Sequence, residues 1–235
     1  MSPDIRRAAD RAVTTTPWLD SKHSFSFGDY YDPQNTHHGL LLVNNDDVVA
    51  PASGFDTHPH HDMEIVTWVL SGSLTHRDSA GNSGVIHAGL AQRLSAGTGI
   101  MHSEKNESPE EPVHFVQMWV VPDETGITPG YQQAQVDLTI GLVTIASGRT
   151  DDTAITIHNR NAALHGARLS PGEAVELPQA PYLHLFVARG DVTLEGAGQL
   201  GEGDAVRFTA SGGQRVSATA PSEILVWEMH AGLAA

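Results

Sequence analysis

The sequence predicts an all-β protein. Two observations support this prediction, and the length of the chain permits a large core. Short apolar runs, several of them rich in β-branched residues, recur along the 235 residues. Clusters of Gly, Pro, Asn and Asp separate these runs and are typical of turns. A chain of this length can bury a substantial core in one large all-β domain or two smaller ones. We therefore expect many short strands, arranged as a sandwich or a barrel.

Eight apolar segments are the expected strands, and they spread over most of the chain. In order, they are residues 39–50, 64–70, 84–89, 114–121, 137–147, 183–196, 204–210 and 223–229. One short polar segment, Asp4–Val13, is the only good candidate for a helix. It carries no information on function.

Two pairs of segments resemble each other and indicate a duplicated β unit. Val69–His76 resembles Val187–Gly196, since each ends a strand, turns on a glycine and resumes a strand. Downstream, Gly89–Glu104 aligns with Glu202–Ala218. The segment Val121–Gln133 contains Pro, Gly and polar residues that suit a linker. We expect two copies of one β unit, with their seam in this segment.

The duplication provides an internal comparison for candidate functional residues. Aligned on their glycine turns, three residues of the first copy match three of the second: His58 with Glu176, His60 with Pro178, and Glu64 with Tyr182. The downstream segments add two matches: His102 with Val216, and Glu104 with Ala218. The second copy offers no equivalent set of ligands. We therefore expect the first half to carry the chemistry and the second half to be a structural or regulatory partner.

Composition excludes several classes of function. The chain contains no cysteine, so any metal must be held by nitrogen and oxygen. A formal net charge of −15 opposes direct binding to nucleic acid. No apolar run approaches the ~20 residues that span a bilayer, and residues 1–13 lack the apolar stretch of a signal peptide. We expect a soluble cytoplasmic protein that does not bind membranes.

Two pairs of side chains have the spacing of metal ligands. His58 and His60 are two residues apart, so on an extended segment they leave the same face. His102 and Glu104 repeat this spacing far along the chain. On neighbouring strands the two pairs would point three imidazoles and one carboxylate into one barrel. This set suits a divalent Fe, Mn, Ni, Cu or Zn ion, and an octahedral ion would keep two positions for a substrate and water or dioxygen.

Other histidines and one glutamate have less specific interpretations. His61 is expected on the opposite face of the strand, toward solvent. Glu64 is either a carboxylate that holds a ligand imidazole in its tautomer or the polar start of a strand. The remaining histidines are interpreted as hydrogen-bonded, surface or incidental residues: His37, His38, His76, His87, His114, His158, His165, His184 and His230.

Separated motifs in this order resemble those of one known family. They are Trp18–Pro33, Phe55–Gly72, Ser95–Glu104 and Gly126–Tyr131. Together they resemble the pirins, a branch of the cupin superfamily, and in particular the bacterial pirin-like quercetin 2,3-dioxygenases. The resemblance is close over the first half of the chain and extends to the second half in outline.

The resemblance implies a bicupin of two jelly-roll β-barrels. Residues 1–130 would form an N-terminal cupin domain with a metal site, and residues 131–235 a C-terminal cupin-like domain without ligands. The family pattern carries onto the four residues that the spacing selects: His58, His60, His102 and Glu104. It implies one divalent ion per chain, with Fe(II) expected first and Mn, Ni, Cu, Co or Zn as alternatives. His61 departs from the basic residue of many relatives, which bears on substrate preference.

The activity that the resemblance implies is the opening of a flavonol such as quercetin by dioxygen, with release of carbon monoxide. Glu104 would be a ligand and the base that takes the substrate proton. Four residues are candidates for an apolar wall that excludes water: Phe55, Met63, Met101 and Trp119. A monomer is expected. Two alternatives remain: a regulatory or redox-sensing metal protein that acts through a protein partner, and a cupin enzyme with a non-flavonoid substrate.

Overall fold

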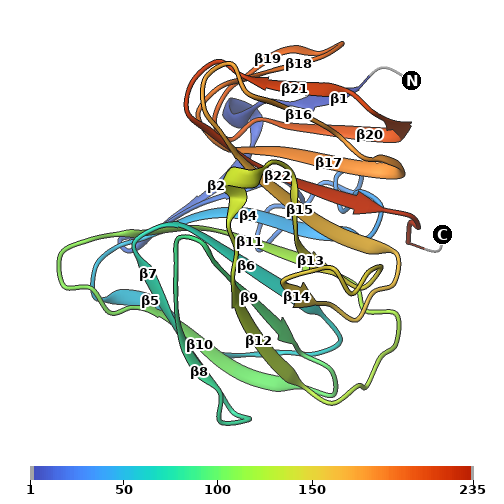
Figure 1. The fold of residues 1–235 in the computed structure, drawn as a ribbon. Coiled ribbons are helices and arrows are strands. Elements are labelled where there is room, and N and C mark those ends of the chain that lie inside the picture. Colours follow the sequence, from blue (N-terminus) through green and yellow to red (C-terminus); the bar gives the residue numbers. More distant parts are fainter. Residues whose placement is uncertain (1–2, 234–235) are drawn as a thin grey trace.

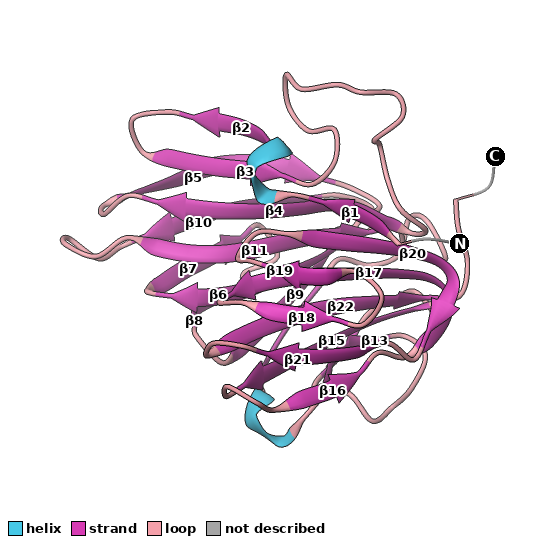
Figure 2. Ribbon diagram, turned by 90° about the horizontal axis from the view of Figure 1, so that it is seen from above, coloured by secondary structure: helices cyan, strands magenta, loops and turns pink. Residues whose placement is uncertain are grey.

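The computed structural model describes residues 3–233, and within them it contains 22 strands and two short 3-10 helices. The strands form two barrels, one from each half of the chain (Figure 1). Seen from above, strands and the loops that connect them make up nearly all of the chain, with two short helical turns in cyan (Figure 2). The predictions of an all-β protein and of two barrel domains are confirmed. Within the described residues, no helix is both long and apolar enough to cross a membrane.

The first barrel packs a seven-stranded sheet against a four-stranded sheet. The large sheet has the order β12-β9-β6-β11-β4-β3-β2, with bounds Gly130–Gln135, Leu90–Ser95, Glu64–Ser71, Val113–Val120, Leu41–Val49, Leu19–His23 and Ala12–Thr15. The small sheet has the order β5-β10-β7-β8, with bounds Ser53–His60, Ile100–Asn106, Ser73–Asp78 and Ser83–His87. All of these pairings are antiparallel.

The second barrel repeats this plan. Its large sheet has the order β1-β20-β17-β22-β15-β13-β14, with bounds Asp4–Arg6, Ala205–Gly212, Gln179–Arg189, Ser222–Met229, Ala162–Leu169, Val143–Ser147 and Ile155–Thr156. Its small sheet has the order β16-β21-β18-β19, with bounds Ala174–Glu176, Arg215–Ala218, Val192–Leu194 and Gly198–Leu200. The helices η1 (Ala8–Asp10) and η2 (Leu138–Ile140) complete the chain.

Each barrel takes one edge strand from the half of the chain that forms the other barrel. Strand β1, at the N-terminus, pairs with β20 and lies among the orange and red strands of the second barrel (Figure 1). Strand β12, at residues 130–135, pairs with β9 of the first barrel. Two strands therefore cross the predicted division at residue 130. That division stays a prediction.

The predicted helix over Asp4–Val13 is wrong. This segment forms β1, the single turn η1 and the start of β2. The reason is tertiary, because Asp204 accepts hydrogen bonds from the Arg7 guanidinium and from the Ala8 backbone N–H. A short polar helix gains little stability in isolation, so these contacts with the second barrel determine the local structure.

The duplicated turns are equivalent, but the alignment beyond them slips. A Cβ added to Gly72 would meet the Pro112 carbonyl oxygen at 2.5 Å, and one added to Gly190 would meet that of Pro221 at 2.2 Å, so the same close approach requires glycine in both copies. The two turns place His76 and Leu194 at equivalent positions.

Strand pairing beyond the turns corrects the predicted matches. Glu104 faces His76, and Val216 faces Leu194, so Val216 takes the place of Glu104 and not of His102. The loop before β21 is two residues shorter than the loop before β10, which an ungapped alignment cannot show. The matches predicted for His58 and His60 shift as well. Pairing of β5 with β10 and the corresponding pairing in the second barrel match His58 with Leu177 and His60 with Gln179.

The largest apolar core lies between the two seven-stranded sheets, where residues of both barrels such as Trp68 and Trp227 pack together. The second barrel has one continuous aliphatic core of its own. The interior of the first barrel holds two smaller clusters, one around Phe115 and one around Ile65. Between these small clusters the first barrel has room for polar side chains.

Candidate metal centre and adjoining cavity

Strands β5 and β10 bring three histidines together in the small sheet of the first barrel. His58 faces His102 directly across the antiparallel pair, and His60 follows on the same face as His58. One ring nitrogen from each of the three lies within 4.8 Å of the others. Alternation of side chains along each strand produces this convergence, as the spacing predicts.

The orientation of His102 leaves one nitrogen free toward the other two histidines. Its Nε2 is buried and has no hydrogen-bond partner. Its Nδ1 lies 3.4 Å from Nδ1 of His76, whose Nε2 lies 3.1 Å from Asp78 Oδ2. Because the Asp78 carboxylate only accepts, His76 donates from Nε2 and accepts at Nδ1 from His102. This chain fixes the tautomer of His102 with a free lone pair on Nε2.

The other two histidines also present unprotonated nitrogen. His58 donates from Nδ1 to the Asp56 carbonyl oxygen at 2.7 Å, which leaves Nε2 free. Burial, with the neighbouring His58, lowers the pKa of His60 to about 4. Burial and the adjacent imidazoles lower the pKa of His102 to about 2. Neutral imidazole is the form that binds a metal.

Glu104 lies on the same inward face of β10 as His102, but another residue holds its carboxylate. The side-chain amide of Gln117, on β11, donates to Oε1 at 3.0 Å and to Oε2 at 2.8 Å. The Trp119 indole N–H donates to the Gln117 carbonyl at 3.2 Å and so fixes the direction of that amide. Burial raises the pKa of Glu104 to about 7. The three histidines form the convergent group, and Glu104 stands beside it as a predicted fourth ligand.

A cavity of about 180 Å³ opens beside this group. Its aromatic lining is Phe27 and Phe55, and its polar lining is Thr14, Ser21, His23, Asp29, Asn45, Asp47 and Gln117. The Phe55 ring lies 6.3 Å from that of His58, and Phe27 reaches His60 through the Trp119 ring. Gln117 links the cavity to Glu104 directly. The cavity therefore adjoins the histidine group.

Of the four predicted wall residues, one lines the cavity. Phe55 does so, and Trp119 packs its ring at 4.9 Å from that of His60. Met63 packs against the cluster around Ile65. Met101 is wrong as a wall residue, because strand alternation sends it outward, where it is 41% exposed.

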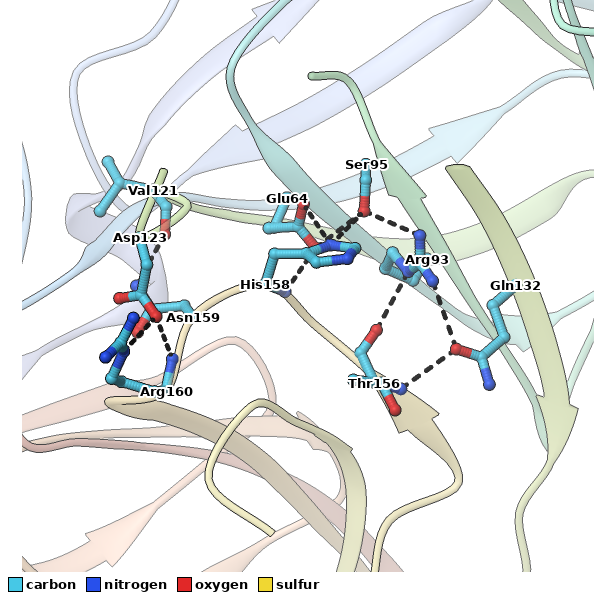
Figure 3. A network of polar contacts seen from close by, with 10 residues as sticks. All are labelled: Glu64, Arg93, Ser95, Val121, Asp123, Gln132, Thr156, His158, Asn159 and Arg160. Carbon is cyan, nitrogen blue, oxygen red and sulfur yellow. Dashed lines mark hydrogen bonds and ion pairs between the residues drawn. The ribbon is translucent and has the colours of Figure 1, made fainter. Parts of the chain in front are cut away.

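Glu64 is fully buried but does not contact a ligand histidine. It accepts hydrogen bonds from the Ser95 hydroxyl and from the His158 backbone N–H, both at 3.0 Å (Figure 3). His158 comes from the second half of the chain, so this contact joins the two barrels. Arg93 continues the network to the Thr156 carbonyl oxygen. The suggestion that Glu64 orients a ligand imidazole is wrong, and so is the interpretation of His158 as incidental.

The other histidines lie outside the metal centre. His61 is exposed, with its side chain 81% accessible, as predicted. His165 and His230 both contact Glu228, and His38 contacts the Phe208 carbonyl oxygen. His184 is fully buried, and burial lowers its pKa well below 6.5.

Sequence reasoning missed several residues of the site. Gln117 is a polar residue in the middle of an apolar strand, and His76 and Asp78 repeat the two-residue spacing of the ligand pairs. These signals were visible. Asp47 gave none, since it lies in a run of polar residues that reads equally well as a solvent-facing edge.

The residues present fit a divalent metal ion. The buried and unpartnered Nε2 of His102 is costly unless something binds it. Three neutral imidazoles with a carboxylate nearby, and no thiolate, form a donor set for a first-row divalent ion.

Comparisons with known proteins identify the family. Residues 6–120 match the family model described as Pirin, and residues 144–229 match the one described as Quercetinase C-terminal cupin domain. A Mycobacterium tuberculosis protein provisionally named quercetin 2,3-dioxygenase is 70% identical over 98% of this chain and 96% of its own. The quercetin 2,3-dioxygenase of Escherichia coli K12 is 37% identical over 96% of this chain and 97% of its own.

Solved structures give the same result. The crystal structure of YhhW from Escherichia coli has a TM-score of 0.91 at 36% identity, covering 99% of this chain and 100% of that one. The structure of bacterial pirin YhhW in complex with nickel(II) has a TM-score of 0.89 at 35% identity, covering 98% and 100%. The fold, the histidine group and these similarities together show that this chain belongs to the pirin family, with two cupin domains.

Proposed function

We propose that this protein is a metal-dependent dioxygenase that opens flavonols such as quercetin. The observation that carries the proposal is the convergence of three imidazoles beside a partly aromatic cavity. The names of the relatives supply the substrate class. The cavity is smaller than the ~300–1,000 Å³ of most ligand pockets, so it would hold one end of a flavonol while the rest lies toward the mouth.

Four residues would hold one divalent ion: His58, His60, His102 and Glu104. Iron(II) is the ion that we expect first, and Mn, Ni, Cu, Co and Zn suit the same donors. When bound, such an ion supplies positive charge that stabilises the deprotonated form of a substrate hydroxyl.

The protein side chains would orient the substrate and move its proton. Glu104 would accept the proton of the flavonol 3-hydroxyl at a carboxylate oxygen, because its side chain lies on the same inward face of β10 as His102. The Gln117 amide would hold this carboxylate in place through the reaction. Phe27 and Phe55 would exclude water from the reacting atoms.

The test measures oxygen uptake together with metal content. Protein loaded with iron without air is mixed with quercetin and dioxygen. We expect uptake by the wild-type protein and a loss of about 100-fold or more in Glu104→Gln. Glu107→Gln is the matched control, because this exposed carboxylate lies just past the end of the same strand. The metal content of Glu104→Gln is measured as well. Loss of the ion would identify Glu104 as a ligand, and loss of activity with the ion retained would identify it as a base.

A fully metal-loaded wild-type protein that consumes no oxygen would contradict the proposal. It would favour a regulatory role through a protein partner, or a non-flavonoid substrate.

A further inference from the structure

A second buried carboxyl lines the cavity and has no role in the chemistry described so far. Asp47, on β4, is 3% exposed. The Ser21 hydroxyl donates to its Oδ1. Within residues 3–233, its Oδ2 accepts no hydrogen bond and its carboxyl makes no ion pair. The nearby Arg11 guanidinium pairs instead with the adjacent Asp46.

Such a carboxyl is not required by the fold. Asp47 faces Phe115 across β4 and β11, and the equivalent pair in the second barrel is Ala167 with Ile224. Ala167 belongs to the aliphatic core. A buried carboxyl without a cation is costly, and the same backbone position is filled by a methyl group in the other copy. The cost therefore points to a ligand.

The neighbouring polar groups are already engaged with one another. His23 donates from Nδ1 to Asn45 Oδ1 at 2.9 Å, and the Thr14 hydroxyl lies 2.8 Å from His23 Nε2. The Asn45 carbonyl can only accept, so the proton is on Nδ1 and Thr14 donates to Nε2. Neither nitrogen of His23 remains for a ligand. The cavity is lined by two aspartates, the exposed Asp29 and the buried Asp47, and the Oδ2 of Asp47 is the buried carboxylate oxygen that has no donor among the described residues.

The surroundings define the chemistry of the group that would reach Asp47. Phe27 stacks on His23 at 5.1 Å, and Phe55 and Leu19 add apolar surface. A flat ring fits between such walls, and a hydroxyl on its edge would donate to the carboxyl.

We propose that Asp47, oriented by Ser21, determines specificity by accepting a hydrogen bond from a ring hydroxyl of the substrate. This inference rests on the proposed flavonol activity and adds the requirement for a hydroxyl away from the atoms that meet the metal.

The test compares three flavonols that differ only in the hydroxyls of the pendant ring: galangin with none, kaempferol with one and quercetin with two. Dissociation constants are measured by tryptophan fluorescence, on nickel-loaded protein without oxygen. We expect wild-type protein to bind kaempferol and quercetin more tightly than galangin. Asp47→Ala, which copies the second barrel, weakens binding of the hydroxylated pair by about tenfold and leaves galangin unchanged.

Controls separate selectivity from damage. Asp20→Ala alters an exposed carboxylate of the neighbouring strand β3 and leaves all three affinities unchanged. Ser21→Ala keeps the carboxyl, frees its orientation and weakens only the hydroxylated ligands, by less than Asp47→Ala does. If Asp47→Ala does not fold, the inference is tested with Ser21→Ala alone.

Two results would overturn the inference while the proposed function stands. They are an equal loss for all three flavonols, or no loss for any. A wild-type protein that binds none of the three would instead overturn the proposed function and the inference with it.

Discussion

In the first barrel Glu104 faces His76 across β10 and β7, and at the equivalent place in the second barrel Val216 faces Leu194. The substitution of polar by aliphatic side chains continues on the facing sheet. Three further equivalent pairs are Gln117 and Val226, Thr67 and Leu185, and Gln92 and Val206. Every polar member is buried, and every aliphatic member belongs to the continuous core of the second barrel. One strand order supports both interiors.

The difference separates stability from chemistry. Each buried Val or Leu of the second barrel stabilises the fold by about 1.5–3 kcal/mol. A buried polar group contributes only through its hydrogen bonds, at about 1 kcal/mol net for each. The interior of the first barrel therefore contributes less per residue, and its apolar clusters are smaller. The core between the two large sheets, which both barrels share, compensates.

The largest expected effect follows from breaking the metal site itself. His60→Ala removes one of the three convergent imidazoles, and we expect the content of about one divalent ion per chain to fall to none. His61→Ala, at the exposed neighbour, leaves the content unchanged. Metal analysis after dialysis measures both. Full metal content in His60→Ala would contradict the ligand assignment, and ordered metal in the second barrel of a soaked crystal would contradict the contrast between the barrels.

The inward direction of these ligands could be predicted because it is local. Residues two apart on a strand share a face. The pairs His58 with His60 and His102 with Glu104 therefore needed only a strand assignment. The repeat was visible because the close approach of another backbone segment requires glycine at both Gly72 and Gly190.

The contacts that depend on pairing between distant strands could not be predicted. Gln117 reaches Glu104 only because β11 and β10 lie in facing sheets. Glu64 meets His158 across 94 residues, and β1 leaves its neighbours in sequence to pair with the second barrel. A shift of one or two residues in a loop moves every such contact. The expected helix failed for this reason too.

A smaller effect tests whether the second barrel depends on its aliphatic lining. Val216→Thr keeps the shape of the side chain and buries a hydroxyl among Leu and Val side chains, so we expect the free energy of unfolding to fall by about 2 kcal/mol. Ser217→Thr is the control, since this side chain points away from the core on the same strand. Chemical denaturation measures both. An equal cost for the two variants would mean that the interior accepts polar groups freely.

The smallest effect concerns the pH dependence that a buried carboxyl gives the first barrel. Burial raises the pKa of Asp47 to about 7, from an ordinary value of 3.8. The folded protein thus keeps a proton that the unfolded chain releases, and the contribution of Asp47 to stability falls as the pH rises from about 4 to 7. Asp47→Asn removes this dependence. Relative to wild type, the metal-free variant should gain about 1–2 kcal/mol across this range, less than the full linkage of ~4 kcal/mol because water enters the cavity.

The adjacent Asp46 is the matched control, because its pKa is shifted in the opposite direction to that of Asp47. Burial alone would raise its pKa, but the hydrogen bond from His114 and the charge of Arg11 outweigh burial and lower it. Asp46 therefore stabilises the fold above its ordinary pKa and loses this effect as the pH falls, so Asp46→Asn costs stability near neutral pH and less in acid. Denaturation of both variants from pH 2 to 7 gives slopes in different windows: the cost of Asp46→Asn shrinks as the pH falls below about 4, whereas the gain of Asp47→Asn grows as the pH rises from about 4 to 7. Equal slopes would mean that Asp47 is solvated like a surface carboxylate, and the cavity would then lack the unpaired acceptor that distinguishes it from the second barrel.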